Sequence, residues 1–145
     1  YEKNLHNKLF DLFVKNNISF EFRPHFMSIK KKEFLIEERF HNFMNMEKLL
    51  NFKKYKYLIT DWSGIFLEFA LINSTKPFLI NTEKKILNED YRKFSNIPIE
   101  VSSRKEIAHE IEINKIENIL DLFKLNQNIN DKKIIDNFYK NNFYF

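Results

Sequence analysis

The sequence contains no cysteine, which excludes disulfide bonds, thiolate metal ligands and a cysteine nucleophile. This absence fits a reducing compartment. With one glycine and three prolines, the chain also has few residues for sharp turns, and it has no glycine-rich phosphate loop. Phenylalanine, by contrast, occurs 17 times. We interpret that bias as a result of AT-rich coding and not as a functional signal.

Long apolar runs are also missing. No stretch approaches the roughly 20 apolar residues that a membrane-spanning helix needs. The first residues, Tyr1-Glu2-Lys3-Asn4, do not have the pattern of a signal peptide. We therefore expect a cytoplasmic protein. Because the sequence does not start with methionine, we expect it to be a piece of a longer chain.

Positive charge is in modest excess, with a net charge of +4 and an isoelectric point near 9.1. The lysines occur in short groups at residues 30–32, 53–56, 84–85 and 132–133, and acidic residues separate these groups. A nucleic-acid-binding surface would be more continuous, so we predict a solvated surface and no nucleic-acid partner. The excess charge can still steer an anionic nucleotide, or draw the protein to an anionic membrane surface.

The hydrophobic pattern predicts strands and helices in alternation. Strands are predicted at residues 18–23, 55–59, 77–81 and 97–101, and helices at residues 2–15, 29–43 (with 33–36 as an alternative strand), 46–52, 64–72, 103–113, 115–124 and 131–139. A polar loop is predicted at residues 82–96, and Ser103 and Glu106 would form a capping box. This order predicts an α/β fold, a Rossmann-like parallel sheet flanked by helices. We expect a single domain over residues 1–145, with C-terminal helices over about 103–140.

The stretch 55–71 is the centre of this pattern. A short apolar strand leads into a polar turn at residues 60–63 and then into a helix in which Glu68 is the only charged residue. A helix that is apolar on all sides is a buried helix, so we expect strand and helix to be covered. Ligands of open α/β sheets bind beyond the carboxyl ends of the strands, and a helix N-terminus offers N–H groups to phosphate. The turn is therefore the expected ligand site.

Five residues near the predicted strand ends are candidates for binding a phosphate group. Arg23 offers a bidentate fork to phosphate and His25 a single donor, although His25 can equally be an ordinary surface histidine. Asp61 and Ser63 can simply cap the helix. Alternatively, the Ser63 hydroxyl binds a phosphate together with the N–H groups of Ser63 and Gly64, the only glycine, which lets a ligand approach the backbone.

Glu68 lies one helical turn after Gly64, on the same face. It would either pair with a nearby lysine or arginine, or hold a ligand hydroxyl such as that of a ribose. We expect no metal and no cofactor. His6, His41 and His109 lack companions at metal-ligand spacing, so we interpret them as ordinary surface or helix residues.

Three motifs appear in order: Arg23-Pro24-His25, then Thr60-Asp61-Trp62-Ser63-Gly64 with Glu68 in the following helix, then the strand at 76–80. Together they resemble the CDP-glycerol glycerophosphotransferase family, the teichoic-acid-type polymerases and primases with relatives in capsule synthesis. Residues 83–91 and 97–101 also look like one branch of this family. The resemblance covers residues 18–104, and the order and spacing are more specific than any single motif.

The resemblance implies a GT-B architecture in which this chain forms most of the C-terminal, donor-binding domain. The implied reaction is attack of an acceptor hydroxyl on the β-phosphate of CDP-glycerol, with CMP leaving. The implied partners are a CDP-activated donor, a cell-surface polymer as acceptor, and the inner face of the bacterial cell membrane. By the same carry-over, Glu68 would contact the donor glycerol or ribose, and the donor phosphates would be bound by Arg23, His25, Thr60, Asp61, Ser63 and Gly64.

The chain departs from the family pattern in three ways. Phe26 stands where the family has a proline, the segment between His25 and Tyr55 is short, and the acceptor domain with the family's base histidine is not among these residues. No catalytic residue is therefore assigned, and enzymatic activity of this chain alone stays open. The alternative is a non-catalytic fragment or interaction module, which predicts a large exposed apolar patch and self-association.

Overall fold

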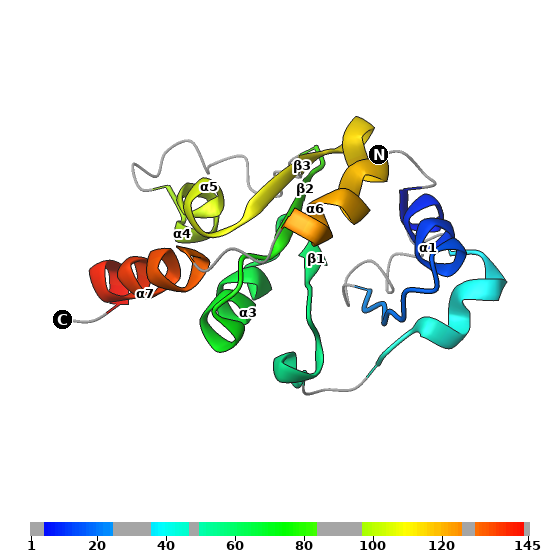
Figure 1. Cartoon of the computed structure of the whole chain (residues 1–145), viewed down its shortest axis with the longest axis horizontal. Coiled ribbons are helices and arrows are strands. Elements are labelled where there is room, and N and C mark those ends of the chain that lie inside the picture. The colour runs from blue at the N-terminus through cyan, green and yellow to red at the C-terminus, as the bar shows by residue number, and fades with distance from the viewer. Residues whose placement is uncertain (1–4, 25–35, 47–49, 84–96, 126–129, 144–145) are drawn as a thin grey trace. The chain divides into compact units, whose positions relative to one another are not determined.

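The structure is a computed structural model, and it describes residues 5–24, 36–46, 50–83, 97–125 and 130–143 (Figure 1). The chain divides into two compact units, Tyr1–Leu50 and Asn51–Phe145. The expectation of one domain over the whole length stays a prediction.

The first unit is held together by aromatic side chains. Helix α1 (Leu5–Lys15) confirms the predicted N-terminal helix over the residues described, and it buries one apolar face, as its spacing requires. The 3₁₀ helix η1 (Glu38–Phe43) follows later in the chain. The Phe20 ring lies 5.0 Å from that of Phe10 in α1 and 4.3 Å from that of Phe43 in η1. These rings therefore join the elements of this unit.

The strand predicted at residues 18–23 is wrong, since only Phe22 has a ladder partner, an isolated parallel bridge to Met44. The alternation of apolar and polar residues does correspond to an alternation in burial. Phe20 and Phe22 are half-buried, whereas the neighbouring Ser19 and Glu21 are exposed. The rings of Phe20 and Phe22 pack on α1, which accounts for the alternation without a sheet.

Two helix predictions also change. The helix predicted at 29–43 lies partly outside the described residues, and its described end forms the 3₁₀ helix η1. The helix predicted at 46–52 is wrong where it is described: Asn51 is extended, and the 3₁₀ helix η2 (Phe52–Lys54) follows it. Phe52 is buried edge-on against Phe69, so tertiary packing fixes this segment more than helix propensity does.

The second unit is built on a three-stranded parallel sheet, in the order β1-β2-β3 (Figure 1). The strands are β1 (Ile59–Thr60), β2 (Phe78–Asn81) and β3 (His109–Glu112). β2 confirms the strand predicted at 77–81. The predicted class, α/β with a parallel sheet flanked by helices, is confirmed.

Helices cover both faces of the sheet, and β2 shows how. Successive strand residues point to opposite faces. Leu79 joins a buried cluster with Phe66, Ile107 and Ile135, which come from three different helices, and the helix of Ile135 contacts the other two. On the other face the Phe78 ring lies 5.2 Å from that of Phe123. Besides η2, the described helices of this unit are α3 (Ile65–Asn73), α4 (Ile99–Ser102), α5 (Arg104–Ile107), η4 (Ile113–Asn118), α6 (Ile119–Leu125) and α7 (Asn130–Phe143).

The helix predicted at 103–113 is wrong in its second half, which forms β3. α5 ends at Ile107, and Ala108 is extended (φ −140°, ψ 167°). The predicted capping box is not formed, because the Ser103 hydroxyl donates backwards to the Ile99 carbonyl at 2.6 Å. The His-Glu-Ile-Glu sequence of β3 has low strand propensity, which hid the strand. His109 therefore lies in a strand, stacked on Phe78, and not in a helix.

Two predicted extended segments differ from the structure. In the segment predicted at 55–59, regular pairing begins only at Ile59, although the Leu58 carbonyl already accepts a hydrogen bond from the Phe78 N–H. The extended segment predicted at 97–101 is wrong from Ile99 onward, where α4 begins, whereas Pro98 just before it is extended.

The remaining helices are close to those predicted. α3 confirms the helix predicted at 64–72, and α7 confirms the helix predicted at 131–139. The helix predicted at 115–124 is confirmed by α6 in its second part, whereas its first part is the 3₁₀ helix η4. The expectation that α3 is covered all round is wrong. Leu71 and Ile72 on its outer face are 48% and 44% exposed.

Candidate functional site

The candidate site is the turn between β1 and α3. Thr60 is the last residue of β1 and is paired with Leu79 of the central strand. Asp61, Ser63 and Gly64 then lead into α3, and all three are half-buried. The turn therefore lies at the carboxyl end of a parallel strand and at the amino end of a nine-residue helix, as predicted.

Capping of α3 by side chains is weak. Gly64 occupies the N-cap position with helical backbone angles (φ −64°, ψ −10°). The Ser63 hydroxyl accepts a hydrogen bond from the Ile65 N–H at a long 3.5 Å. A well-formed cap would be about 0.5 Å shorter. The serine hydroxyl thus lies beside the first N–H groups of the helix, where a phosphate oxygen would be bound.

The single glycine is close to a side chain of α4. A Cβ atom built on Gly64 would lie 3.1 Å from Cγ of Glu100, closer than most Cβ contacts. Because the Gly64 backbone is helical, its conformation does not require glycine. A side chain at position 64 would therefore require the Glu100 side chain to shift by a few tenths of an ångström.

Arg104 holds the strand ends around the turn together. Its side chain is almost fully buried, with 2% of the residue exposed. One terminal nitrogen donates to the Asp61 carbonyl at 2.6 Å, the other donates to Oδ1 of Asn81 at 3.0 Å, and Nε pairs with Glu110 at 3.1 Å. These partners come from the turn after β1, from β2 and from β3, so one guanidinium links all three strands.

Trp62 completes this arrangement. The Arg104 guanidinium carbon lies 4.0 Å from the centre of the Trp62 ring, and the indole N–H donates to the Thr82 carbonyl at 2.9 Å. The position of the turn is therefore fixed from both sides. Sequence reasoning missed Arg104, because in the sequence it resembles an ordinary arginine in the first turn of a surface helix.

A groove lies beside the turn, with a volume of about 500 Å³. Its walls are the side chains of Leu67 and Leu71 from α3 and of Tyr139 and Phe143 from α7, with Gly64, Glu68 and Glu100 completing the lining. Tyr139 is buried and donates a short hydrogen bond to the Leu67 carbonyl. Burial, and to a smaller degree the charge of Glu68, raises the pKa of Tyr139 to about 12.

The predicted site residues fall into two groups. Thr60, Asp61, Ser63 and Gly64 follow one another in the turn, and Glu68 lies in the adjacent groove. Arg23 belongs to the other compact unit, where it follows the Phe22 bridge and is exposed, and His25 lies outside the described residues. Their role at the turn therefore stays a prediction.

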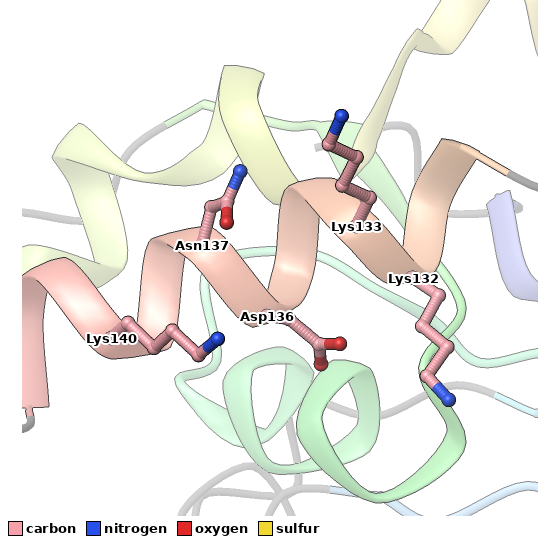
Figure 2. Close-up of a pocket in the computed structure, with 5 residues that line it drawn as sticks. All are labelled: Lys132, Lys133, Asp136, Asn137 and Lys140. Carbon is pink, nitrogen blue, oxygen red and sulfur yellow. The ribbon is translucent and has the colours of Figure 1, made fainter.

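The exposed surface of α7 includes Lys132, Lys133, Asp136, Asn137 and Lys140. Figure 2 shows Lys132 and Lys133 pointing to different sides of the helix, with Asp136 on the side of Lys132. The lysines do not converge on one point, so this face fits the predicted solvated surface.

In the described part of the chain, no group of histidine, aspartate and glutamate side chains could hold a metal ion. None of the described helices has both the length and the apolar character needed to cross a membrane. The chain matches no protein-family model, and comparisons with curated protein sequences and with solved structures gave no match.

Proposed function

We propose that the chain is the donor-binding part of a transferase that moves glycerol phosphate, or a related polyol or sugar phosphate, from a CDP-activated donor to a cell-surface polymer. The observation that carries this proposal is the turn 60–64, which follows a parallel strand and opens a helix beside the Ser63 hydroxyl. The motif resemblance supplies the donor class and the GT-B architecture.

In this proposal the turn binds the donor phosphates through Thr60, Asp61, Ser63 and Gly64. Arg104, which donates to the Asp61 carbonyl, is already ion-paired with Glu110. The N–H groups of α3 would stabilise the phosphate charge, and the motif resemblance adds Arg23 and His25 as phosphate ligands. Glu68, one turn further along α3, would contact the glycerol or ribose.

The reaction would form a bond between the acceptor oxygen and the donor β-phosphorus and break the bond from that phosphorus to CMP. The acceptor hydroxyl loses its proton to a base that we do not assign among the described residues. Positioning of the two reactants and stabilisation of charge on the transferred phosphate would contribute most of the rate.

Calorimetric titration with CDP-glycerol, CMP and a UDP-sugar tests the proposal. We expect the cytidine ligands to bind, and Ser63→Ala to weaken them about tenfold, the effect of losing one hydrogen bond to a charged group. Ser19→Ala, at an exposed serine in the first unit, is the matched control and should change nothing. Folded protein that binds none of these ligands at millimolar concentration would refute the proposal.

One observation favours a second candidate, a non-catalytic interaction module. Leu71 and Ile72 of α3 and Phe143 of α7 are 44% to 48% exposed, although they are large and apolar. Leu71 and Phe143 line the same groove. Exposed apolar side chains that gather at one place mark interaction surfaces. A monomer at all concentrations by analytical ultracentrifugation, with no change on Leu71→Ser, would count against self-association through this surface.

A further inference from the structure

The groove between α3 and α7 has a composition of its own. Four apolar or aromatic side chains form its walls, and Leu71 and Phe143 are each about half exposed at its edge. Its volume of about 500 Å³ lies within the range of small-molecule sites. The groove can therefore take an organic group that has apolar substituents.

Two carboxylates, Glu68 and Glu100, face this groove. Among the described residues, none forms a hydrogen bond or an ion pair with either carboxylate, and none of those that line the groove is a lysine or an arginine. An anionic ligand would add to the negative charge here, whereas a cation would be complementary to both carboxylates.

The aromatic rings also favour a cation. The rings of Tyr139 and Phe143 stack with their centres 5.3 Å apart and their planes 25° apart. The negative face of an aromatic ring attracts ammonium groups, and the Phe143 ring, 47% exposed at the edge of the groove, is the accessible one of this pair. Gly64 also lines the groove, and a Cβ atom there would lie 3.1 Å from Cγ of Glu100.

We propose that the groove formed by Leu67, Leu71, Tyr139 and Phe143 binds an alkylammonium group, with Glu68 and Glu100 compensating its charge. The inference does not depend on donor binding at the turn, because it uses neither the Ser63 hydroxyl nor the first N–H groups of α3.

The test is an NMR titration with choline and, as the matched neutral probe, 3,3-dimethylbutan-1-ol, in which carbon replaces the charged nitrogen. We expect choline to shift the resonances of the groove residues and the neutral probe to bind at least tenfold more weakly. Glu68→Gln and Glu100→Gln should each weaken choline about tenfold without affecting the neutral probe. Glu117→Gln, at an exposed glutamate in η4, is the control.

Equal binding of choline and its neutral analogue, or unchanged choline binding in both glutamine variants, would overturn the inference. Phosphocholine distinguishes the two sources of the amine. If phosphocholine binds more tightly than choline, and Ser63→Ala removes this gain, the ammonium group belongs to the same ligand as the phosphate bound at the turn. If phosphocholine binds more weakly than choline, the groove binds a free amine. Binding of CMP without choline would refute this inference alone, and binding of choline without CMP would refute only the donor proposal.

Discussion

Among single residues, Arg104 has the largest structural role in the second unit. Arginines are almost never fully buried unless they are paired, and this one contacts a carbonyl, an amide, a carboxylate and an indole ring. Its ion pair with Glu110 is only partly shielded, since the glutamate side chain is 24% exposed. The hydrogen bonds to the turn and to Asn81 are the contacts that no water molecule could easily replace.

Arg104→Met should therefore lower the free energy of unfolding by about 3–5 kcal/mol, the cost of leaving buried partners unpaired. Urea denaturation measures this change. Lys105→Met, which removes the same charge from the exposed neighbouring residue, should stay within about 0.5 kcal/mol of the parent. Equal effects of the two substitutions would show that the network does not hold the strand ends.

At Thr82, by contrast, we expect a substitution to raise the free energy of unfolding. Its hydroxyl is buried and has no hydrogen-bond partner in the described part of the chain. Thr82→Val removes the unsatisfied group and keeps the shape, so we expect a gain of about 1 kcal/mol in thermal or urea denaturation. In the control, Thr75→Val, the lost hydroxyl donates to the Asn73 carbonyl at 3.1 Å, and stability should fall. A loss in Thr82→Val would reveal a partner for that hydroxyl.

Among the elements, helix α3 has apolar residues on two faces, but only one of these faces is buried. Phe66, Phe69 and Ala70 are fully buried, whereas Leu71 and Ile72 are about half exposed. The apolar outer face supports the interaction surface discussed above and contributes little to the folded monomer.

Phe66→Ala should lower the free energy of unfolding by about 3–5 kcal/mol, because it leaves a cavity in the core. Leu71→Ala on the same helix should cost less than about 1 kcal/mol. Chemical denaturation of both variants at low protein concentration measures the difference. A large loss in Leu71→Ala that disappears on dilution would instead mean that this face is covered by a second copy.

The contact between α7 and α3 should weaken at alkaline pH. Tyr139 has its pKa raised to about 12 by burial and by Glu68, from a usual value of 10. The folded state thus binds the phenolic proton more tightly than the unfolded chain does. Its stabilising effect is complete below pH 10 and is lost as the pH rises towards 12.

Denaturation of the parent and of Tyr139→Phe across pH 9 to 12 measures this loss. We expect the parent to lose stability relative to the variant above pH 10, after allowance for the hydrogen bond to Leu67 that the variant lacks at every pH. Parallel curves for the two proteins would contradict the raised pKa.

The order strand, turn, helix and strand through residues 59–81 followed from the sequence because its signals are local. Apolar runs, a polar turn and a proline before β2 each act within a few residues. β3 was missed because His109, Glu110 and Glu112 are poor strand formers, and the pairing with β2 overrides their propensity. The strand prediction at 18–23 is wrong because an alternation of apolar and polar residues does not by itself show that a neighbouring strand is present to pair with.

The candidate site was only half predictable for the same reason. Ser63 and Gly64 are adjacent in sequence to the strand end, so their place followed from the local pattern. Arg104 and Glu100 reach the turn from about 40 residues away through the fold of α4 and α5, and nothing in the local sequence indicates that approach.

In the whole molecule, the two compact units have separate internal contacts. The second unit contains the complete sheet and a buried cluster that includes Leu79, Ile107 and Ile135. We expect residues 51–145 alone to fold cooperatively, with circular dichroism typical of an α/β domain and a thermal midpoint within a few degrees of the full chain. A fragment without a cooperative transition would show that the second unit needs the first.

The central position of β2 has a further consequence. Its backbone is hydrogen-bonded to a strand on each side, and its two faces are covered by separate layers, Phe78 against α6 and Leu79 against α3, α5 and α7. Local fluctuations that uncover one layer leave the other in place. The amide hydrogens of β2 will therefore be among the last to exchange with deuterium, and only when the whole unit opens.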